Sequence, residues 1–295
     1  MRGVIYPQAP LPGDRVRVVA PSGPFDRALC LRGIAWLGER YRVAFDWSMF
    51  ERTGYLAGPD ARRLDELDAA LADPETKVVV AARGGYGLTR ILGRAKLSSL
   101  LDSPKWMVGL SDVTALHVEC ARLGIASLHA HNCAGLGRGD ARARAAWRQA
   151  LENPTATRVF DGLATWHGGS ALGPLFGGNL TVLFTCAAAG RLKVPDGAVL
   201  VLEDVNESAY RLDRMLTALL SAGALDRVSA VVVGDLTDCP SAPYGVPPEE
   251  TVRSRLLELR VPVLAGLHFG HGRENVPLVL GAPARVEPSR LTLTP

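Results

Sequence analysis

Aromatic residues, paired cysteines and long apolar runs are all scarce in this sequence of 295 residues. Only 6% of the residues are aromatic, which argues against platforms that stack on nucleobases. The five cysteines are scattered and include no CxxC pair, so we expect reduced thiols and not a disulfide framework or a zinc ribbon.

No apolar run approaches the roughly 18 residues that a membrane-spanning helix needs. Pro7, Pro10 and Pro12 interrupt the stretch in which a signal peptide has its apolar helix. We therefore expect a soluble, cytoplasmic protein that does not bind a membrane.

The charge balance is mild, with 33 basic and 30 acidic residues and a net charge of +3. The basic residues are interleaved with acids, so a nucleic-acid partner is not expected. With 47% hydrophobic residues the chain can bury a sizeable core, in one large domain or two of moderate size.

The first half alternates short apolar runs with helical patterns, which predicts a parallel sheet covered by helices on both faces. The predicted strands are residues 15–20, 42–47, 77–82 and 106–110, and the predicted helices are residues 26–41, 59–72 and a helix from about 112. The second half repeats the alternation, with predicted strands at residues 198–202, 228–233 and 262–269.

An amphipathic helix lies between the first two of these later strands. Its apolar positions are Leu212, Met215, Leu216, Leu219 and Leu220, and Ser208 stands where it can cap the helix. The pattern weakens between the two halves. The predicted organisation is an N-terminal α/β domain (1–135), a linker with an exposed helix (136–170) and a C-terminal β/α domain (171–295).

The sharpest local motif is WMVGLSDVTAL, in which a strand runs into Ser111 and a helix follows at once. A serine at such a turn has the setting of a nucleophile elbow, although Val113 stands where G-x-S-x-G has its last glycine. The helix N-terminus favours developing negative charge nearby. The alternative is that Ser111 or Asp112 only caps the helix, and this segment alone leaves both interpretations open.

The motif RGGYG follows the strand at residues 77–82. Its glycines permit close approach of backbone N–H groups to a ligand, so a phosphate loop, an oxyanion-hole loop and a plain turn all compete. The spacings of the dinucleotide and P-loop motifs are absent, which disfavours nucleotide binding. The position at the carboxyl end of a strand favours a functional role.

Two further segments carry acids and a histidine. In VLVLEDVNE, Glu203 and Asp204 face opposite sides of a strand, and Glu203 is the better candidate to orient a base, whereas Glu207 suits a helix N-terminus. In GLHFGHGREN, His271 lies between two glycines, and His268 is expected to be a packed residue of the strand.

The remaining histidines are weaker candidates. His117 lies six residues after Ser111, on another face of the helix, and is a poor partner for its hydroxyl. His129 and His131 share a strand face before Cys133, but no carboxylate lies nearby in the sequence, so no metal site is expected. His167 falls in the predicted linker.

Together these segments supply a nucleophile, a base and an acid in the order Ser111, Glu203, His271. A serine needs a histidine to take its proton, and the histidine needs a carboxylate to orient it. Because the serine lies in the first half and the other two residues in the second, we expect the site at a domain interface.

The sequence closely resembles the LD-carboxypeptidase family of serine peptidases, which also includes the microcin C self-immunity hydrolases. The resemblance runs over nearly the whole chain. The segments that carry it are, in order, VRVVAPSGPF, VVVAARGGYGLTRIL, WMVGLSDVTALH, GPLFGGNLTVL, LVLEDVNESAYRLDRML and FGHGRENVPLVLGAPARV.

The resemblance implies an N-terminal flavodoxin-like parallel-sheet domain, a smaller C-terminal β/α domain and a homodimer. It assigns Ser111 as the nucleophile, His271 as the base and Glu203 as its orienting acid. It places the oxyanion-hole N–H groups on Asp112 and on Gly85, or on its neighbour Gly84. No metal or organic cofactor is implied.

For the main branch of the family, the implied reaction is release of the terminal D-alanine from murein tetrapeptides, across an L,D bond, in cell-wall recycling. One alternative is a self-immunity hydrolase that cleaves a microcin C-like peptide–nucleotide. Its family members carry an extra aromatic-bearing loop, and Trp166 lies in about that region. Two functions without catalysis also compete, a non-catalytic muropeptide-binding protein and a nucleotide-binding module built on RGGYG.

Overall fold

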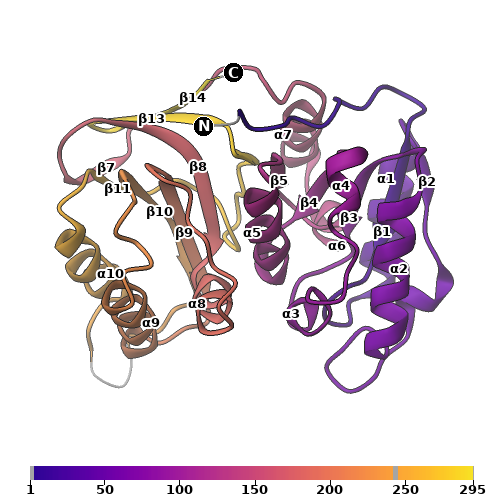
Figure 1. The fold of residues 1–295 in the computed structure, drawn as a ribbon, viewed down its shortest axis with the longest axis horizontal. Helices are drawn as coiled ribbons and strands as arrows, with labels where there is room; N and C mark the ends of the chain where they lie inside the picture. Colours follow the sequence, from indigo (N-terminus) through magenta and orange to yellow (C-terminus); the bar gives the residue numbers. More distant parts are fainter. Residues whose placement is uncertain (1–2, 242–244, 295) are drawn as a thin grey trace. The chain divides into compact units, whose positions relative to one another are not determined.

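The computed structural model describes residues 3–241 and 245–294 (Figure 1). The chain forms two compact units. The first comprises the chain up to Pro154 together with Val276–Val279, and the second comprises Thr155–Asn275 and the chain from Leu280 onward. The α/β fold class is confirmed, whereas the domain boundaries predicted at residues 135 and 170 stay a prediction.

The first unit is built on a six-stranded sheet of order β12-β5-β4-β3-β1-β2. The strands are β1 (Arg15–Val19), β2 (Arg42–Ala44), β3 (Thr76–Ala81), β4 (Trp106–Gly109), β5 (Ser127–His129) and β12 (Leu278–Leu280). Strands β1 to β5 pair in parallel. The loops after them therefore emerge at one edge of the sheet, where ligands of such folds collect.

Helices flank this sheet in Figure 1. They are α1 (Arg27–Gly38), α2 (Asp60–Ala72), α3 (Leu88–Ile91), α4 (Ser99–Asp102), α5 (Thr114–Leu123), α6 (Cys133–Arg138) and α7 (Ala141–Glu152). Helix α1 begins after Asp26, whose carboxylate accepts the backbone N–H of Leu29 at 2.9 Å. The strand predicted at residues 42–47 stops at Ala44, because Asp46 caps a 3₁₀ turn at Trp47–Phe50.

The second unit contains an eight-stranded sheet of order β6-β14-β13-β8-β9-β10-β11-β7. The strands are β6 (Arg158–Asp161), β7 (Ala164–His167), β8 (Ala171–Asn179), β9 (Val199–Val205), β10 (Ala230–Thr237), β11 (Val263–Ala265), β13 (Pro283–Glu287) and β14 (Arg290–Leu293). Strands β8 to β11 are parallel, and the other four pair antiparallel. Strands β6 and β7 thus lie in the segment predicted as a linker.

Three helices cover the parallel part of this sheet, namely α8 (Leu180–Ala188), α9 (Ala209–Ser221) and α10 (Pro248–Leu256). Helix α9 is the predicted amphipathic helix, and it buries Leu212, Met215, Leu216 and Leu219. Ser208 occupies the N-cap position, but its side chain makes no capping hydrogen bond, contrary to expectation.

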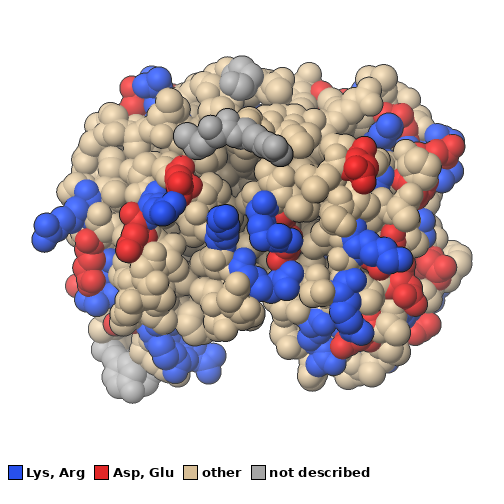
Figure 2. Space-filling model, viewed as in Figure 1, with Lys and Arg blue, Asp and Glu red and all other residues tan. Residues whose placement is uncertain are grey.

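Charged side chains of both signs lie interspersed over most of the face drawn in Figure 2, in keeping with the net charge of +3. None of the helices in the described residues combines the length and the apolar character needed to cross a bilayer.

Candidate active site

Ser111 occupies a sharp turn between β4 and α5. The strand ends at Gly109, a 3₁₀ turn spans Ser111–Val113, and α5 begins at Thr114. The φ angle of Ser111 is +68°, in the left-handed region that side-chain-bearing residues rarely adopt. Such local strain is typical of functional turns and matches the geometry of a nucleophile elbow. The capping alternative is wrong, because neither turn nor helix has a side-chain cap.

The RGGYG loop lies directly against this serine. A Cβ added to Gly84 would fall 2.5 Å from the Cβ and 2.9 Å from the Oγ of Ser111, so only glycine fits there. The carbonyl of Gly84 accepts the N–H of Gly23 at 3.1 Å, which ties the loop to the one that follows β1. Gly85 has φ +100°, so the backbone turns at the residue predicted to donate to an oxyanion.

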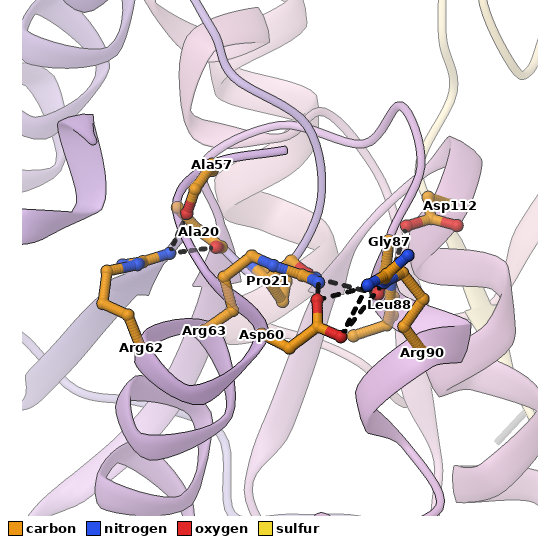
Figure 3. Close-up of polar contacts among 10 residues, drawn as sticks. All are labelled: Ala20, Pro21, Ala57, Asp60, Arg62, Arg63, Gly87, Leu88, Arg90 and Asp112. Atoms are coloured by element: carbon orange, nitrogen blue, oxygen red, sulfur yellow. Dashed lines mark hydrogen bonds and ion pairs between the residues drawn. The ribbon is translucent and has the colours of Figure 1, made fainter. Parts of the chain in front are cut away.

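The carboxylate of Asp112 joins the serine turn to the far end of the same loop. It is buried and accepts the backbone N–H of Leu88, the first residue of α3, at 2.8 Å (Figure 3). Burial raises the pKa of Asp112, and the bond from Leu88 opposes that rise. The side chain of Asp112 thus fixes the loop, while its backbone N–H is the group predicted to hold an oxyanion.

A buried arginine, which the sequence pattern did not single out, holds two of these loops together. The Arg63 guanidinium donates to the carbonyl of Gly87 at 2.8 Å, to the carbonyl of Pro21, and to the carboxylate of Asp60 (Figure 3). Arg90 binds the same carboxylate at 2.9 Å. Arg63 is fully buried, so its charge needs these partners.

His117 supports the end of the strand that carries the serine. Its Nε2 lies 3.0 Å from the carbonyl of Gly109, and its Nδ1 lies 2.9 Å from the Oγ of Ser127. Because a carbonyl only accepts, Nε2 carries the proton and Nδ1 accepts from the hydroxyl. Burial lowers the pKa of His117 to about 4, so the ring is neutral at pH 7.

The low pKa of His117 leads us to predict that the folded protein loses stability as the pH falls. An unfolded histidine takes up a proton near pH 6.5, but the folded protein resists it until about pH 4, so stability present above pH 6.5 is lost as the pH falls toward 4. The loss from this one group is about 3 kcal/mol. We expect chemical denaturation at pH 7 and at pH 4.5 to show a smaller pH-dependent loss in His117→Asn than in the wild type. Replacing the exposed His167 should leave that difference unchanged, and an equal pH-dependent loss in His117→Asn would contradict the prediction.

His129, His131 and Cys133 lie close together in the sequence, and no metal site is expected for them. Over residues 3–241 and 245–294, no group of three histidine, cysteine or acidic side chains is arranged to hold a metal ion. His129 instead packs beside His117 in the core, with ring centroids 6.0 Å apart.

In the second unit, Glu203 and His271 form a close pair. Glu203 is fully buried near the carboxyl end of β9, and its Oε2 lies 2.7 Å from the Nδ1 of His271 in the loop after β11. With the proton on Nδ1, the Nε2 of His271 is the basic nitrogen of the ring. Burial raises the pKa of Glu203, and the bond to His271 opposes that rise.

Asp204, the next residue, has a structural role on the opposite face of the strand. Its carboxylate accepts hydrogen bonds from the Nδ2 of Asn179 at 3.0 Å and from both the backbone N–H and the hydroxyl of Thr181, near the start of α8. The strand alternation therefore separates the two acids as predicted. The expectation for His268 is wrong: its side chain is 65% exposed and pairs with Asp235 at 3.2 Å.

Gly270 leaves room for the Glu203–His271 pair. Its φ is +113°, and an added Cβ would lie 2.4 Å from the Oε2 of Glu203. We predict that Gly270→Ala lowers kcat/KM at least tenfold, because the methyl group must displace the carboxylate or the histidine loop. Gly266→Ala is the matched control, since Gly266 also has a positive φ (+89°) but no atom within 4 Å of an added Cβ. Equal activity of the two variants would contradict the prediction.

The predicted site residues thus fall into two local groups. Ser111, Asp112 and Gly85 belong to the first unit, and Glu203 and His271 belong to the second.

Comparison with known proteins agrees with the motifs. The LD-carboxypeptidase N-terminal domain matches residues 16–130, and the LD-carboxypeptidase C-terminal domain matches residues 172–286. Murein tetrapeptide carboxypeptidase of Pseudomonas aeruginosa is 33% identical over 251 residues, which cover 81% of this chain and 82% of that protein.

Solved structures share the fold. Muramoyltetrapeptide carboxypeptidase from Oxalobacter formigenes has a TM-score of 0.84 at 27% identity, covering 95% of this chain and 99% of that one. The microcin C7 self immunity protein MccF, in complex with aspartyl sulfamoyl adenosine, has a TM-score of 0.88 at 19% identity, covering 99% and 98%. The two domain matches span most of the sequence, and the chain therefore belongs to the LD-carboxypeptidase family.

Proposed function

We propose that this protein is a serine carboxypeptidase that releases the terminal D-alanine from murein tetrapeptides. The observation that carries the proposal is the 2.7 Å hydrogen bond between Glu203 and His271, because a buried carboxylate on Nδ1 prepares an imidazole for proton transfer. The positive φ of Ser111 and its contact with Gly84 support the assignment of the nucleophile. The relatives named for murein and muramoyl tetrapeptides support the substrate.

The proposed reaction begins when the Ser111 hydroxyl attacks the carbonyl that precedes the terminal D-alanine. Its proton passes to Nε2 of His271, and the Glu203 carboxylate stabilises the imidazolium that forms. The N–H groups of Asp112 and Gly85 donate to the oxyanion.

His271 then gives its proton to the amine of D-alanine, and the C–N bond breaks to leave an acyl-enzyme on Ser111. Water, deprotonated by His271, attacks this ester, and the tripeptide leaves. The serine regains its proton, so the enzyme is unchanged after one cycle.

A direct assay tests the substrate assignment. Incubation with murein tetrapeptide is expected to release free D-alanine, whereas the same peptide ending in L-alanine should be a poor substrate. Aspartyl sulfamoyl adenosine is the second arm, because a solved relative of the same fold is complexed with it. Cleavage of that compound without release of D-alanine would favour a self-immunity hydrolase, and binding of the tetrapeptide without turnover would favour a muropeptide-binding protein.

The family resemblance also leads us to propose a cytoplasmic homodimer. Sedimentation of the purified chain is expected to give twice the mass of 31.4 kDa, and a monomer would contradict that part of the proposal.

A further inference from the structure

Two exposed tyrosines stand side by side on loops of the first unit. Tyr55 is 65% exposed and Tyr86 is 47% exposed, and their ring centroids are 5.9 Å apart at an interplanar angle of 46°. Large aromatic rings usually bury most of their surface, and a neighbouring pair left in solvent is accessible to a ligand.

Backbone geometry shapes the two loops that carry these rings. Tyr86 lies between Gly85 and Gly87, whose positive φ angles (+100° and +131°) set the loop. Tyr55 lies in a tight turn in which Thr53 and Leu56 exchange two backbone hydrogen bonds of 3.0 Å. A tyrosine side chain has only two torsion angles to order, so it loses little conformational entropy when it binds.

The tyrosine pair is connected to the proposed nucleophile. Tyr86 is two residues from Gly84, which contacts Ser111. A Cβ added to Gly23 would lie 3.3 Å from the carbonyl oxygen of Gly84 and 3.5 Å from that of Tyr55. The loops that carry the two rings therefore meet beside the serine turn.

The surrounding charges indicate what kind of ligand fits. Arg90 forms an ion pair with Asp60, with three hydrogen bonds of 2.9–3.1 Å. Arg83 donates a hydrogen bond to the carbonyl of Pro24 at 2.7 Å. Both guanidinium groups thus have partners of their own. The two rings, tilted by 46° to each other, present apolar faces edged by hydroxyl groups. A pyranose ring matches such a surface, because one of its faces carries C–H bonds and its rim carries hydroxyls.

We propose that Tyr55 and Tyr86 form a platform for the sugar ring of a muramoyl group attached to the amino end of the tetrapeptide. This inference rests on the proposed function and names the form of the substrate that the enzyme prefers.

The kinetic test compares two substrates that differ only in the sugar, N-acetylmuramoyl-tetrapeptide and the free tetrapeptide. We expect wild-type kcat/KM to favour the sugar-bearing peptide by about three- to tenfold, the range of one or two aromatic contacts. The ratio is expected to fall toward one in Tyr55→Ala and Tyr86→Ala and to persist in Tyr86→Phe. Trp47→Ala removes another aromatic of the first unit, 60% exposed, and should keep the ratio. An unchanged ratio in the double alanine variant would overturn the proposal.

A binding experiment separates this proposal from the proposed function. Saturation-transfer NMR on Ser111→Ala should mark the sugar protons of N-acetylmuramoyl-tetrapeptide, and the additional loss of both tyrosines should abolish that signal. Absence of sugar saturation overturns the platform even if the wild type cleaves the peptide. Failure to release D-alanine contradicts the proposed function, while the NMR signal still decides the platform. Saturation of adenine protons of AMP, without saturation of the muramoyl sugar, would assign the rings to a nucleobase and overturn the proposal.

Discussion

Ser111→Ala is expected to lower kcat/KM for D-alanine release by roughly 10⁴- to 10⁶-fold, as loss of a nucleophile does in serine hydrolases. The hydroxyl is the group that forms the proposed acyl-enzyme, and a methyl group cannot replace it. Release of D-alanine is measured with purified enzyme and tetrapeptide.

The matched control is Ser98→Ala, an exposed serine of the same unit, which should keep wild-type activity. Serine and alanine both carry a Cβ and meet the same backbone constraint at φ +68°. The variant should therefore fold with a melting temperature close to that of the wild type. Retention of more than a tenth of the wild-type rate in a folded Ser111→Ala protein would contradict the assignment.

The second large effect is expected for Glu203→Gln, with a loss of about 10³- to 10⁴-fold in kcat/KM. The amide carries no charge to stabilise an imidazolium, and its NH₂ group can donate to Nδ1 of His271 and so select the wrong tautomer. The control is Glu258→Gln, an exposed acid of the same unit that pairs with Arg255. Activity within tenfold of the wild type would contradict the role of Glu203.

The same substitution, although it lowers activity, is expected to stabilise the folded protein relative to the wild type as the pH rises. Burial raises the pKa of Glu203, so the stability that this group contributes is present at low pH and is lost as the pH rises through its folded-state pKa. Glutamine does not ionise and escapes that loss. We therefore expect the melting temperature of Glu203→Gln, relative to the wild type, to be higher at pH 8 than at pH 5. A fall in relative stability from pH 5 to pH 8 would contradict the sign.

The architecture could be predicted from the sequence because buried parallel strands appear in it as short apolar runs between helical patterns. Details that depend on single side chains or on short exposed strands were harder to predict. Asp46 ends β2 with a 3₁₀ turn that hydrophobicity does not reveal, and Arg63 resembles the solvated face of a helix until its carbonyl partners are known. The turn-forming residues of the predicted linker concealed β6 and β7, which are short and largely exposed.

The candidate site was predictable to a different degree in its two parts. Strand alternation separates Glu203 from Asp204, and the strand–turn–helix pattern around Ser111 predicts a sharp turn, although not its positive φ. The contact of Glu203 with His271 joins residues 68 positions apart, which no local spacing can predict. Their catalytic roles, with those of Ser111, Gly85 and Asp112, stay predictions.

The most direct test of the proposed chemistry is to locate the acyl group during turnover. The enzyme is mixed with tetrapeptide, quenched in acid within milliseconds and digested for mass spectrometry, with hydroxylamine added in a parallel reaction to intercept the ester. We predict a tripeptidyl group on the fragment that contains Ser111 and a tripeptidyl hydroxamate in the parallel reaction. An acyl group on another residue, or turnover that yields neither adduct, would contradict the account.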